Sequence, residues 1–243
     1  MGMHRRIAIV AALEREVKSA IRLWRAEERQ HEGRTFKFYE GEQAVLICGG
    51  IGPEPARRAT QAVIAFYSPS IVLSVGFAGA LTPDLKVGDI FTPARIINLA
   101  DGSKVETGDG HGTLLSLGYV ANKEEKLKLA KAYGAQAVDM EAAAVARGAE
   151  AQGIGFRAVK AISDGVDFSM PPMKGAIDSA GNLHTGSFLF SAFLRPWTWA
   201  TVFRLARNSS SAAKTLTNYL NQYNQGAEIL NETATPVHPI GKT

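Results

Sequence analysis

The sequence contains one cysteine, Cys48, among its 243 residues. A lone thiol excludes a disulfide framework and a zinc site built from cysteines. Long hydrophobic runs are also missing, since apolar stretches such as residues 71–80 fall well short of the roughly 20 residues that span a membrane. The net charge of the chain is small as well. The 27 lysines and arginines exceed the 23 acidic residues by +4, which is too little to indicate nucleic-acid binding.

The composition is that of an ordinary globular protein. Hydrophobic residues make up 46% of the chain and charged residues 21%, which suffices for a sizeable core. The N-terminal residues lead directly into a short strand-like segment and do not form a signal-peptide pattern. We therefore expect a soluble, cytoplasmic protein that binds no nucleic acid.

Strand-like and helix-like segments alternate through the first two thirds of the chain. The expected strands are residues 7–12, 36–40, 43–48, 71–75, 89–97, 114–121, 135–140 and 156–162, and the expected helices are residues 14–25, 53–66, 123–133 and 141–152. This alternation predicts an α/β fold, with helices packed on a central mixed and largely parallel sheet in a three-layer α/β/α sandwich.

The C-terminal part differs in composition. Residues 179–227 contain no aspartate or glutamate, and six aromatic residues fall between Phe188 and Phe203. We expect C-terminal helices over residues 188–206, broken near Pro196, and over 209–223. The predicted organisation is a main domain over 1–178, an aromatic and basic helical extension of it over 179–225, and a flexible tail over 226–243.

Carboxylates and glycines follow four of the expected strands, where ligands of α/β sheets gather. They are Glu14 and Glu16 after the first strand, Gly76 and Gly79 after strand 71–75, Asp139 and Glu141 around the end of strand 135–140, and Ser163 and Asp164 after strand 156–162. Carboxylates around a glycine loop suit acid–base chemistry on an uncharged, polyhydroxylated substrate. Each residue also has a structural interpretation as a helix cap, a dipole partner or a turn residue. His111 has no second residue at metal-ligand spacing, so we predict no metal and no cofactor.

Five motifs resemble, in order, those of the nucleoside phosphorylase/nucleosidase superfamily. They are Ala12-Leu13-Glu14-Arg15-Glu16-Val17; Gly50-Ile51-Gly52; Gly76-Phe77-Ala78-Gly79-Ala80-Leu81 with Val87-Gly88-Asp89-Ile90; Val138-Asp139-Met140-Glu141-Ala142; and Ala161-Ile162-Ser163-Asp164. Over residues 5–167 they look most like the methylthioadenosine/S-adenosylhomocysteine nucleosidases. Residues 205–209 and the aromatic, basic segment before them are similar to the hopanoid-associated members, which are thought to release adenine from adenosylhopane.

The resemblance implies a role for each matched residue. Asp164, oriented by Ser163, would protonate or hydrogen-bond N7 of the departing purine, which requires a raised pKa. Glu16 would orient and deprotonate the attacking water, and Glu141 would bind the ribose hydroxyls with Met140 against the sugar face. The other implied substrate-binding residues are Leu13, Ile51, Phe77, Ala78, Gly79, Tyr119 and Val120, with Tyr119 and Val120 at the adenine.

Water is the favoured nucleophile. The phosphorylase-type Gly-Asp-Pro-x-Arg signature is missing after the first strand, where Glu14 and Glu16 would repel phosphate. Phe77 stands where the nucleosidases usually have serine, so a hydroxyl that could bind phosphate is lost. A phosphate-dependent phosphorylase, a small-substrate methylthioadenosine/S-adenosylhomocysteine nucleosidase and a non-catalytic nucleoside- or lipid-binding module stay open as alternatives.

The substrate is predicted to be an adenosine with a large apolar 5′ group, as in adenosylhopane. The stretch between Asp89 and strand 114–121 is short, and its loop over residues 101–112 is polar. The family usually has a longer excursion there that helps cover the neighbouring subunit's 5′ pocket, so its loss would leave that pocket open for a bulky 5′ group. The aromatic and basic C-terminal segment predicts peripheral contact with the inner membrane or shielding of a lipid, with packing on the core as the alternative. The resemblance also implies a homodimer.

Overall fold

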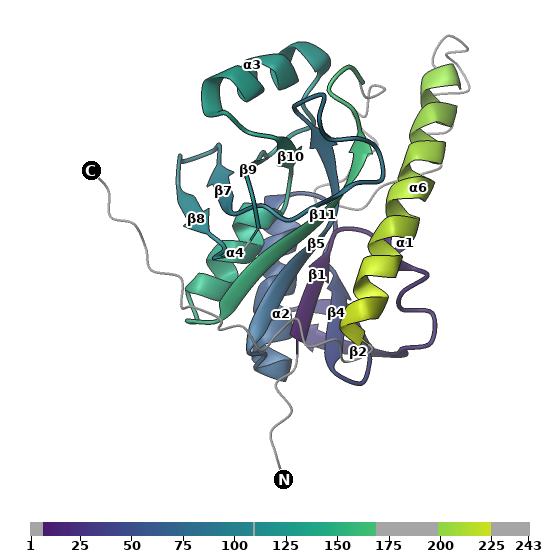
Figure 1. The fold of residues 1–243 in the computed structure, drawn as a ribbon. Coiled ribbons are helices and arrows are strands. Elements are labelled where there is room, and N and C mark those ends of the chain that lie inside the picture. Colours follow the sequence, from purple (N-terminus) through teal and green to yellow (C-terminus); the bar gives the residue numbers. More distant parts are fainter. Residues whose placement is uncertain (1–6, 109, 169–198, 225–243) are drawn as a thin grey trace.

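The fold was analysed in a computed structural model that describes residues 7–108, 110–168 and 199–224 (Figure 1). The strands are β1 (Ile7–Ala11), β2 (Arg25–His31), β3 (Arg34–Glu40), β4 (Ala44–Cys48), β5 (Ile71–Ala80), β6 (Ile90–Phe91), β7 (Arg95–Asn98), β8 (Lys104–Glu106), β9 (Thr113–Ser116), β10 (Ala137–Asp139) and β11 (Gly155–Asp164). The helices are α1 (Glu14–Val17), α2 (Pro53–Tyr67), α3 (Lys123–Tyr133), α4 (Ala142–Glu150) and α6 (Trp199–Asn224). The predicted tail and residues 188–198 of the predicted C-terminal helix lie outside these ranges.

One mixed sheet joins all of these strands. Its main path runs β2-β3-β4-β1-β5-β10-β9-β7-β8, while β11 pairs with β5 and β6. The central strands β4, β1, β5 and β11 are mutually parallel. Because parallel strands end at the same edge of the sheet, β1, β5 and β11 deliver the residues that follow them to one place.

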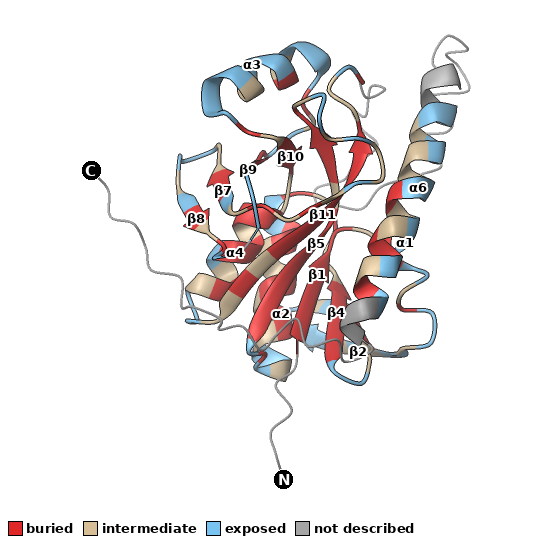
Figure 2. Cartoon of the chain, in the orientation of Figure 1, coloured by how far each residue is buried: buried red, intermediate tan, exposed pale blue. Residues whose placement is uncertain are grey.

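Helices cover both faces of the sheet, and they pack there through alternate residues of the strands. On one face Val10 and Val72 lie in a core cluster with Val63 of α2 and Ala146 of α4. On the other face Ile9, Leu73 and Val159 lie in a cluster with residues of α6, namely Ala212, Leu216 and Leu220. Figure 2 shows the resulting burial of β1, β5 and β11 along most of their length. The predicted α/β fold with a mixed sheet and flanking helices is confirmed.

The predicted helix over residues 14–25 is wrong. Only Glu14–Val17 is helical, and Arg25 begins the edge strand β2, which pairs antiparallel with β3. The hairpin turns at Glu32 and Gly33, whose φ angles of 49° and 75° belong to the left-handed region that tight hairpins require.

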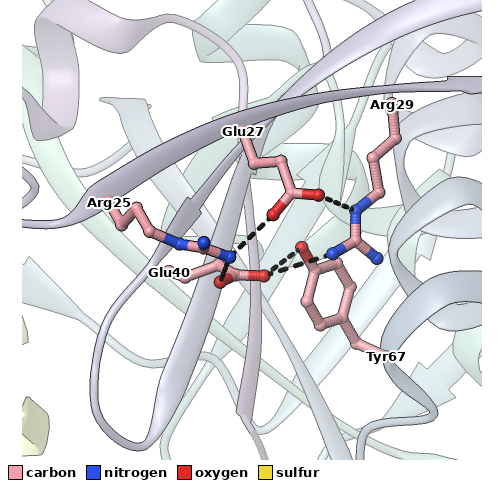
Figure 3. A network of polar contacts seen from close by, with 5 residues as sticks. All are labelled: Arg25, Glu27, Arg29, Glu40 and Tyr67. Atoms are coloured by element: carbon pink, nitrogen blue, oxygen red, sulfur yellow. Dashed lines mark hydrogen bonds and ion pairs between the residues drawn. The ribbon is translucent and has the colours of Figure 1, made fainter.

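Ion pairs across the β2–β3 hairpin explain how so polar a segment becomes a strand (Figure 3). Arg25 of β2 binds Glu40 of β3 at 2.7 Å. Arg29 binds Glu27 on the same strand at 2.9 Å and Glu40 across the hairpin at 3.6 Å. Tyr67, at the end of α2, donates its hydroxyl to Glu40 at 2.7 Å, which ties the hairpin to the layer of α2. Charged side chains also protect an exposed sheet edge against pairing with other chains.

Strand β5 is twice as long as predicted, and Gly76 and Gly79 lie inside it instead of in a following loop. The second half of β5 stays extended because it is paired on both sides. Gly79 and Ala80 pair with β10, and the register of β11 continues along β5 as far as Asp164.

Three other segments differ from the predicted elements. The predicted strand 89–97 is two strands, β6 and β7, separated by residues 92–94, where Pro93 cannot donate a ladder hydrogen bond. Strand β8 lies in the segment predicted to be a polar loop. Helix α6 continues through residues 207–208, where a break was expected.

Among the described residues, no helix is long and apolar enough to cross a membrane.

Helix α3 begins with a reciprocal cap. The Asn122 side chain accepts from the Glu125 backbone N–H at 3.0 Å, and the Glu125 carboxylate accepts from the Asn122 N–H at 2.9 Å. At the other end Gly134 adopts a left-handed conformation, with φ at 59°. Most residues of α3 face solvent, so these caps contribute much of what holds the helix in place.

We predict that Asn122→Ala lowers the free energy of unfolding by about 1 kcal/mol, because it removes the cap of α3. Urea denaturation of the two proteins measures the difference. Asn122→Asp retains an acceptor at the same position and should unfold close to the wild type. Equal stability of the alanine variant and the wild type would contradict a capping role.

Candidate active site

A cleft lies at the edge of the sheet where β1, β5 and β11 end, and it encloses about 910 Å³ of space that is partly open to solvent. All the residues to which the sequence assigned a catalytic or substrate-binding role line it. They are Leu13, Glu16, Ile51, Phe77, Ala78, Gly79, Tyr119, Val120, Met140, Glu141, Ser163 and Asp164. The structure thus brings these residues together, and their individual roles stay predictions.

Asp164 lies at the end of β11, buried to 2% exposure, and both of its carboxylate oxygens have partners. The Ser163 hydroxyl donates to Oδ1 at 2.7 Å, in line with its predicted orienting role. Oδ2 forms an ion pair with the ammonium of Lys126, which also donates to the Gly165 carbonyl at 2.9 Å. Asp164 is therefore fixed from two sides, by its own strand and by helix α3.

Gly79 makes room for this pair. A Cβ at position 79 would lie 2.8 Å from Oδ2 of Asp164 and 3.2 Å from Nζ of Lys126, closer than carbon atoms approach such groups. The glycine of the motif is thus required by the neighbouring ion pair, in addition to any approach of a ligand.

The ion pair alters the expectation for Asp164. The predicted role as a proton donor requires a proton on Asp164, and the donor in contact with its Oδ2 is the Lys126 ammonium. A proton for the leaving group can therefore reach Asp164 from another group.

Lys126 was not among the predicted site residues. Its spacing on α3 gives little indication, because the helix carries four lysines and reads as solvated. Lys160 was missed too, although a lysine within the apolar strand 156–162 is a signal that could have pointed to a buried partner. Asp139 was noted at the end of its strand but given no role. The Lys160 ammonium lies 2.8 Å from Asp139 and donates to Ser74 at 3.0 Å.

A second group of carboxylates lies around Lys160. Glu141 accepts from the Gly52 backbone N–H at 2.8 Å, which explains why the glycine motif after β4 belongs to the site. Burial raises the pKa of Glu141 to about 7, and the negative charge of Asp139 adds to the effect. The nearby Lys160 ammonium opposes the rise without cancelling it.

Glu16 is the most strongly perturbed carboxyl of this group. Burial, and then the charge of Glu141, raise its pKa to about 8, against the effect of Lys160. Its Oε2 is buried and has no hydrogen-bond partner among the described residues. A Cβ at Gly76 would lie 3.0 Å from that oxygen. A buried acceptor without a partner, at a cleft, is placed to receive a proton from a bound molecule.

Helix α6 closes one side of the cleft, a contribution that the sequence did not assign. Leu205 and Ser209 line it from α6, opposite residues of the sheet. Arg15 lines it from α1, so the cleft has cationic side chains from Arg15 and Lys126. Within the described residues, no group of three or more His, Cys, Asp or Glu side chains is arranged to hold a metal ion.

The sequence of the chain is similar to those of known proteins. The profile of the phosphorylase superfamily matches residues 6–116 and 111–175. A 5′-methylthioadenosine/S-adenosylhomocysteine nucleosidase of Haemophilus influenzae is 30% identical over 200 residues, which cover 67% of this chain and 87% of the relative. The enzyme of the same name from Chromohalobacter salexigens is 35% identical over 95 residues, but that alignment spans 38% of this chain and only 40% of the relative.

Solved structures of other proteins share the fold of this chain. Futalosine hydrolase of Helicobacter pylori has a TM-score of 0.64 at 22% identity, covering 90% of this chain and 99% of that one. The 5′-methylthioadenosine/S-adenosylhomocysteine nucleosidase of the same organism has a TM-score of 0.65 at 19% identity, covering 90% and 98%. These comparisons confirm the predicted superfamily and fold, and the names of the relatives agree with the predicted class of N-glycosyl hydrolase.

The raised pKa of Glu16 predicts a pH-dependent stability. Because the folded protein holds a proton on Glu16 that the unfolded chain loses above about pH 4.5, the stabilising effect of that proton is lost as pH rises through about 8. Glu16→Gln removes this loss. Relative to the wild type, its free energy of unfolding should improve by about 4 kcal/mol between pH 5 and pH 9.

Urea denaturation of both proteins at the two pH values gives this difference, with Glu42→Gln as the exposed control that should follow the wild type. Parallel pH profiles for Glu16→Gln and the wild type would contradict the burial of a protonated Glu16.

Proposed function

The chain belongs to the phosphorylase superfamily, and from this we propose that it is a purine nucleosidase, an N-glycosyl hydrolase that releases adenine from a 5′-modified adenosine. The observation that carries the proposal is that one cleft contains two carboxylate centres with different neighbours. Asp164 with Ser163 forms one centre, and Glu16 with Glu141 forms the other.

The two centres match the charges that develop when an N-glycosidic bond breaks. Positive charge builds on the ribose ring and negative charge on the departing purine. Asp164, held by Ser163, is the group for the purine. Glu141, whose pKa is raised to about 7, is the group for the ribose hydroxyls, and Met140 beside it would pack on the sugar. Glu16, whose Oε2 has no partner among the described residues, takes the proton of the attacking water when it is ionised, a form whose share grows as pH rises toward its pKa of about 8.

Buried negative charge favours water over phosphate as the nucleophile. Glu16, Glu141 and Asp139 lie together, with Lys160 as their cation. A phosphate dianion beside them would be repelled. Arg57 and Arg58, which could have bound phosphate, pair instead with Glu54 on α2 and do not line the cleft. Phe77 adds apolar surface to the cleft where a hydroxyl would have helped phosphate.

The decisive assay is adenine release from methylthioadenosine and from adenosine, each with and without inorganic phosphate. We predict release at the same rate under both conditions, with free ribose derivative as the product. Arg15→Gln serves as the matched variant, because Arg15 is the cleft cation outside the Asp164 pair and should be dispensable for hydrolysis. Release that requires phosphate, and that is lost in Arg15→Gln, would identify a phosphorylase instead.

For the 5′ group of the substrate we propose a large apolar substituent, as in adenosylhopane. Phe77 and Leu205 give the cleft an apolar side, and Phe203 on the same helix as Leu205 is 73% exposed. A groove between α1 and α6 adjoins the cleft and carries Arg15, Lys18 and Lys214. Exposed aromatic and cationic side chains together favour contact with an anionic membrane surface, from which such a substrate would be taken.

Two measurements test this substrate class. Adenine release should be faster from adenosylhopane than from methylthioadenosine, and the wild type should co-sediment with phosphatidylglycerol vesicles. Truncation before α6 is unsuitable, because Ala212, Leu216 and Leu220 belong to the core. Phe203→Ser should instead weaken vesicle binding, while Leu23→Ser, at another exposed apolar residue, should leave it unchanged. Preference for methylthioadenosine and equal sedimentation of both variants would contradict the proposal.

We also propose that the chain forms a homodimer, which light scattering on the purified protein tests. A monomer that releases adenine at full rate would show that the cleft is complete within one chain.

A further inference from the structure

We propose that Lys126 is a positioning residue of the cleavage step, which holds Asp164 in the cleft and supplies, through Asp164, the proton that the departing base takes up. This inference rests on the proposed nucleosidase function and extends it to a residue outside the sequence motifs.

The first argument is the position of Lys126 on its helix. Lys126 is 2% exposed, whereas its neighbour Leu127 is 53% exposed, which reverses the usual order of lysine and leucine on a surface helix. Burying an ammonium costs several kcal/mol unless it is well paired, and a buried pair stabilises a fold no better than apolar residues of similar volume. A sequence that keeps a lysine inside and a leucine outside violates a local rule, and such violations concentrate at functional sites.

The second argument is the hydrogen bonding of Asp164. Oδ1 accepts from Ser163, and Oδ2 is paired with Lys126. Within the part of the chain that the structure describes, these are the two side-chain donors at the carboxylate. Of the two, an ammonium gives up a proton far more readily than a serine hydroxyl. Lys126 is thus the group in contact with Asp164 that can deliver a proton to it.

The geometry also keeps this proton away from solvent. Lys126 and Asp164 are both almost fully buried, and the Gly165 carbonyl takes a second N–H of the ammonium. The absence of a side chain at Gly79 lets the pair sit directly against β5. Lys126 and Asp164 both line the cleft, so their contact lies at the cleft wall, where the departing base would receive the proton.

The proton balance closes within the site. As the bond between ribose and base breaks, its electron pair goes to the purine, N7 takes a proton from Asp164, and Asp164 takes one from Lys126. Lys126 ends as a neutral amine and Asp164 as a carboxylate. The attacking water forms the new C–O bond and gives its proton to Glu16 in its ionised form, which becomes populated as pH rises toward 8, so one proton is gained there for the one lost at Lys126. Exchange with solvent restores both residues.

Substitutions at Lys126 distinguish its two proposed roles, which are to hold Asp164 in place and to supply a proton to it. Lys126→Arg keeps the positive charge and a donor for Asp164, but a guanidinium does not release a proton in proteins. We expect kcat for adenine release to fall about 100-fold or more while KM stays within about threefold, since 100-fold is the lower end of what general acid catalysis contributes. Lys128→Arg, at an exposed lysine of the same helix, should leave both constants unchanged. A kcat for Lys126→Arg within about threefold of the wild type would overturn the proton supply.

A second measurement tests the holding role independently of activity. Lys126→Met leaves Asp164 buried without its cation, so the variant should unfold at a lower urea concentration, and adding Asp164→Asn in the same chain should recover most of the loss. Additive effects of the two substitutions would overturn the holding role. Failure of the wild type to release adenine from any nucleoside would instead remove the proposed function, and with it the proton supply, even if the stability coupling is present.

Discussion

The candidate site depends on the neutralisation of buried carboxylates by two buried lysines. Lys126 pairs with Asp164, and Lys160 pairs with Asp139 beside Glu16 and Glu141. Without these cations, four carboxyl groups would share one poorly hydrated region, and their desolvation would oppose folding. With them, the two ends of the cleft acquire opposite properties. Asp164 is paired one to one with a neighbouring ammonium, whereas Glu16 and Glu141 outnumber their cation and have raised pKa values of about 8 and 7.

The sheet provides the room for this arrangement. Gly76 and Gly79 lie in the second half of β5, each directly beside a carboxylate: Glu16 at one end of the cleft and Asp164 at the other. Pairing of β5 with both β10 and β11 keeps these glycines in an extended strand. The shift in register of β11 after Ile162 then sets Asp164 opposite Gly79. Strand pairing, glycine placement and charge pairing are therefore parts of one constraint, which also explains why the motifs that carry them lie far apart in the sequence.

The residues that could be predicted from the sequence are those that follow strands. Carboxylates after apolar runs are visible locally, and the parallel arrangement of the strands brings them together, so Glu16, Glu141 and Asp164 were all assigned to one site. Lys126 could not be found in this way, because its partner lies 38 residues away and its helix reads as solvated. Strand β2 was not predicted, because its stability comes from cross-strand ion pairs and from Tyr67, contacts that periodicity does not encode. The contribution of Leu205 and Ser209 depends on how α6 docks, which is likewise a tertiary property.

The central claim is that the cleft performs chemistry on the leaving group instead of merely binding a nucleoside. Asp164→Asn tests it most directly, since asparagine keeps the size and hydrogen-bonding capacity of the side chain but cannot pass on a proton. Turnover should be measured as adenine release, and binding as the Kd of the same nucleoside by calorimetry. The account predicts that turnover falls about 100-fold or more while Kd changes by less than about tenfold. Equal losses of turnover and binding, or unchanged turnover, would contradict it.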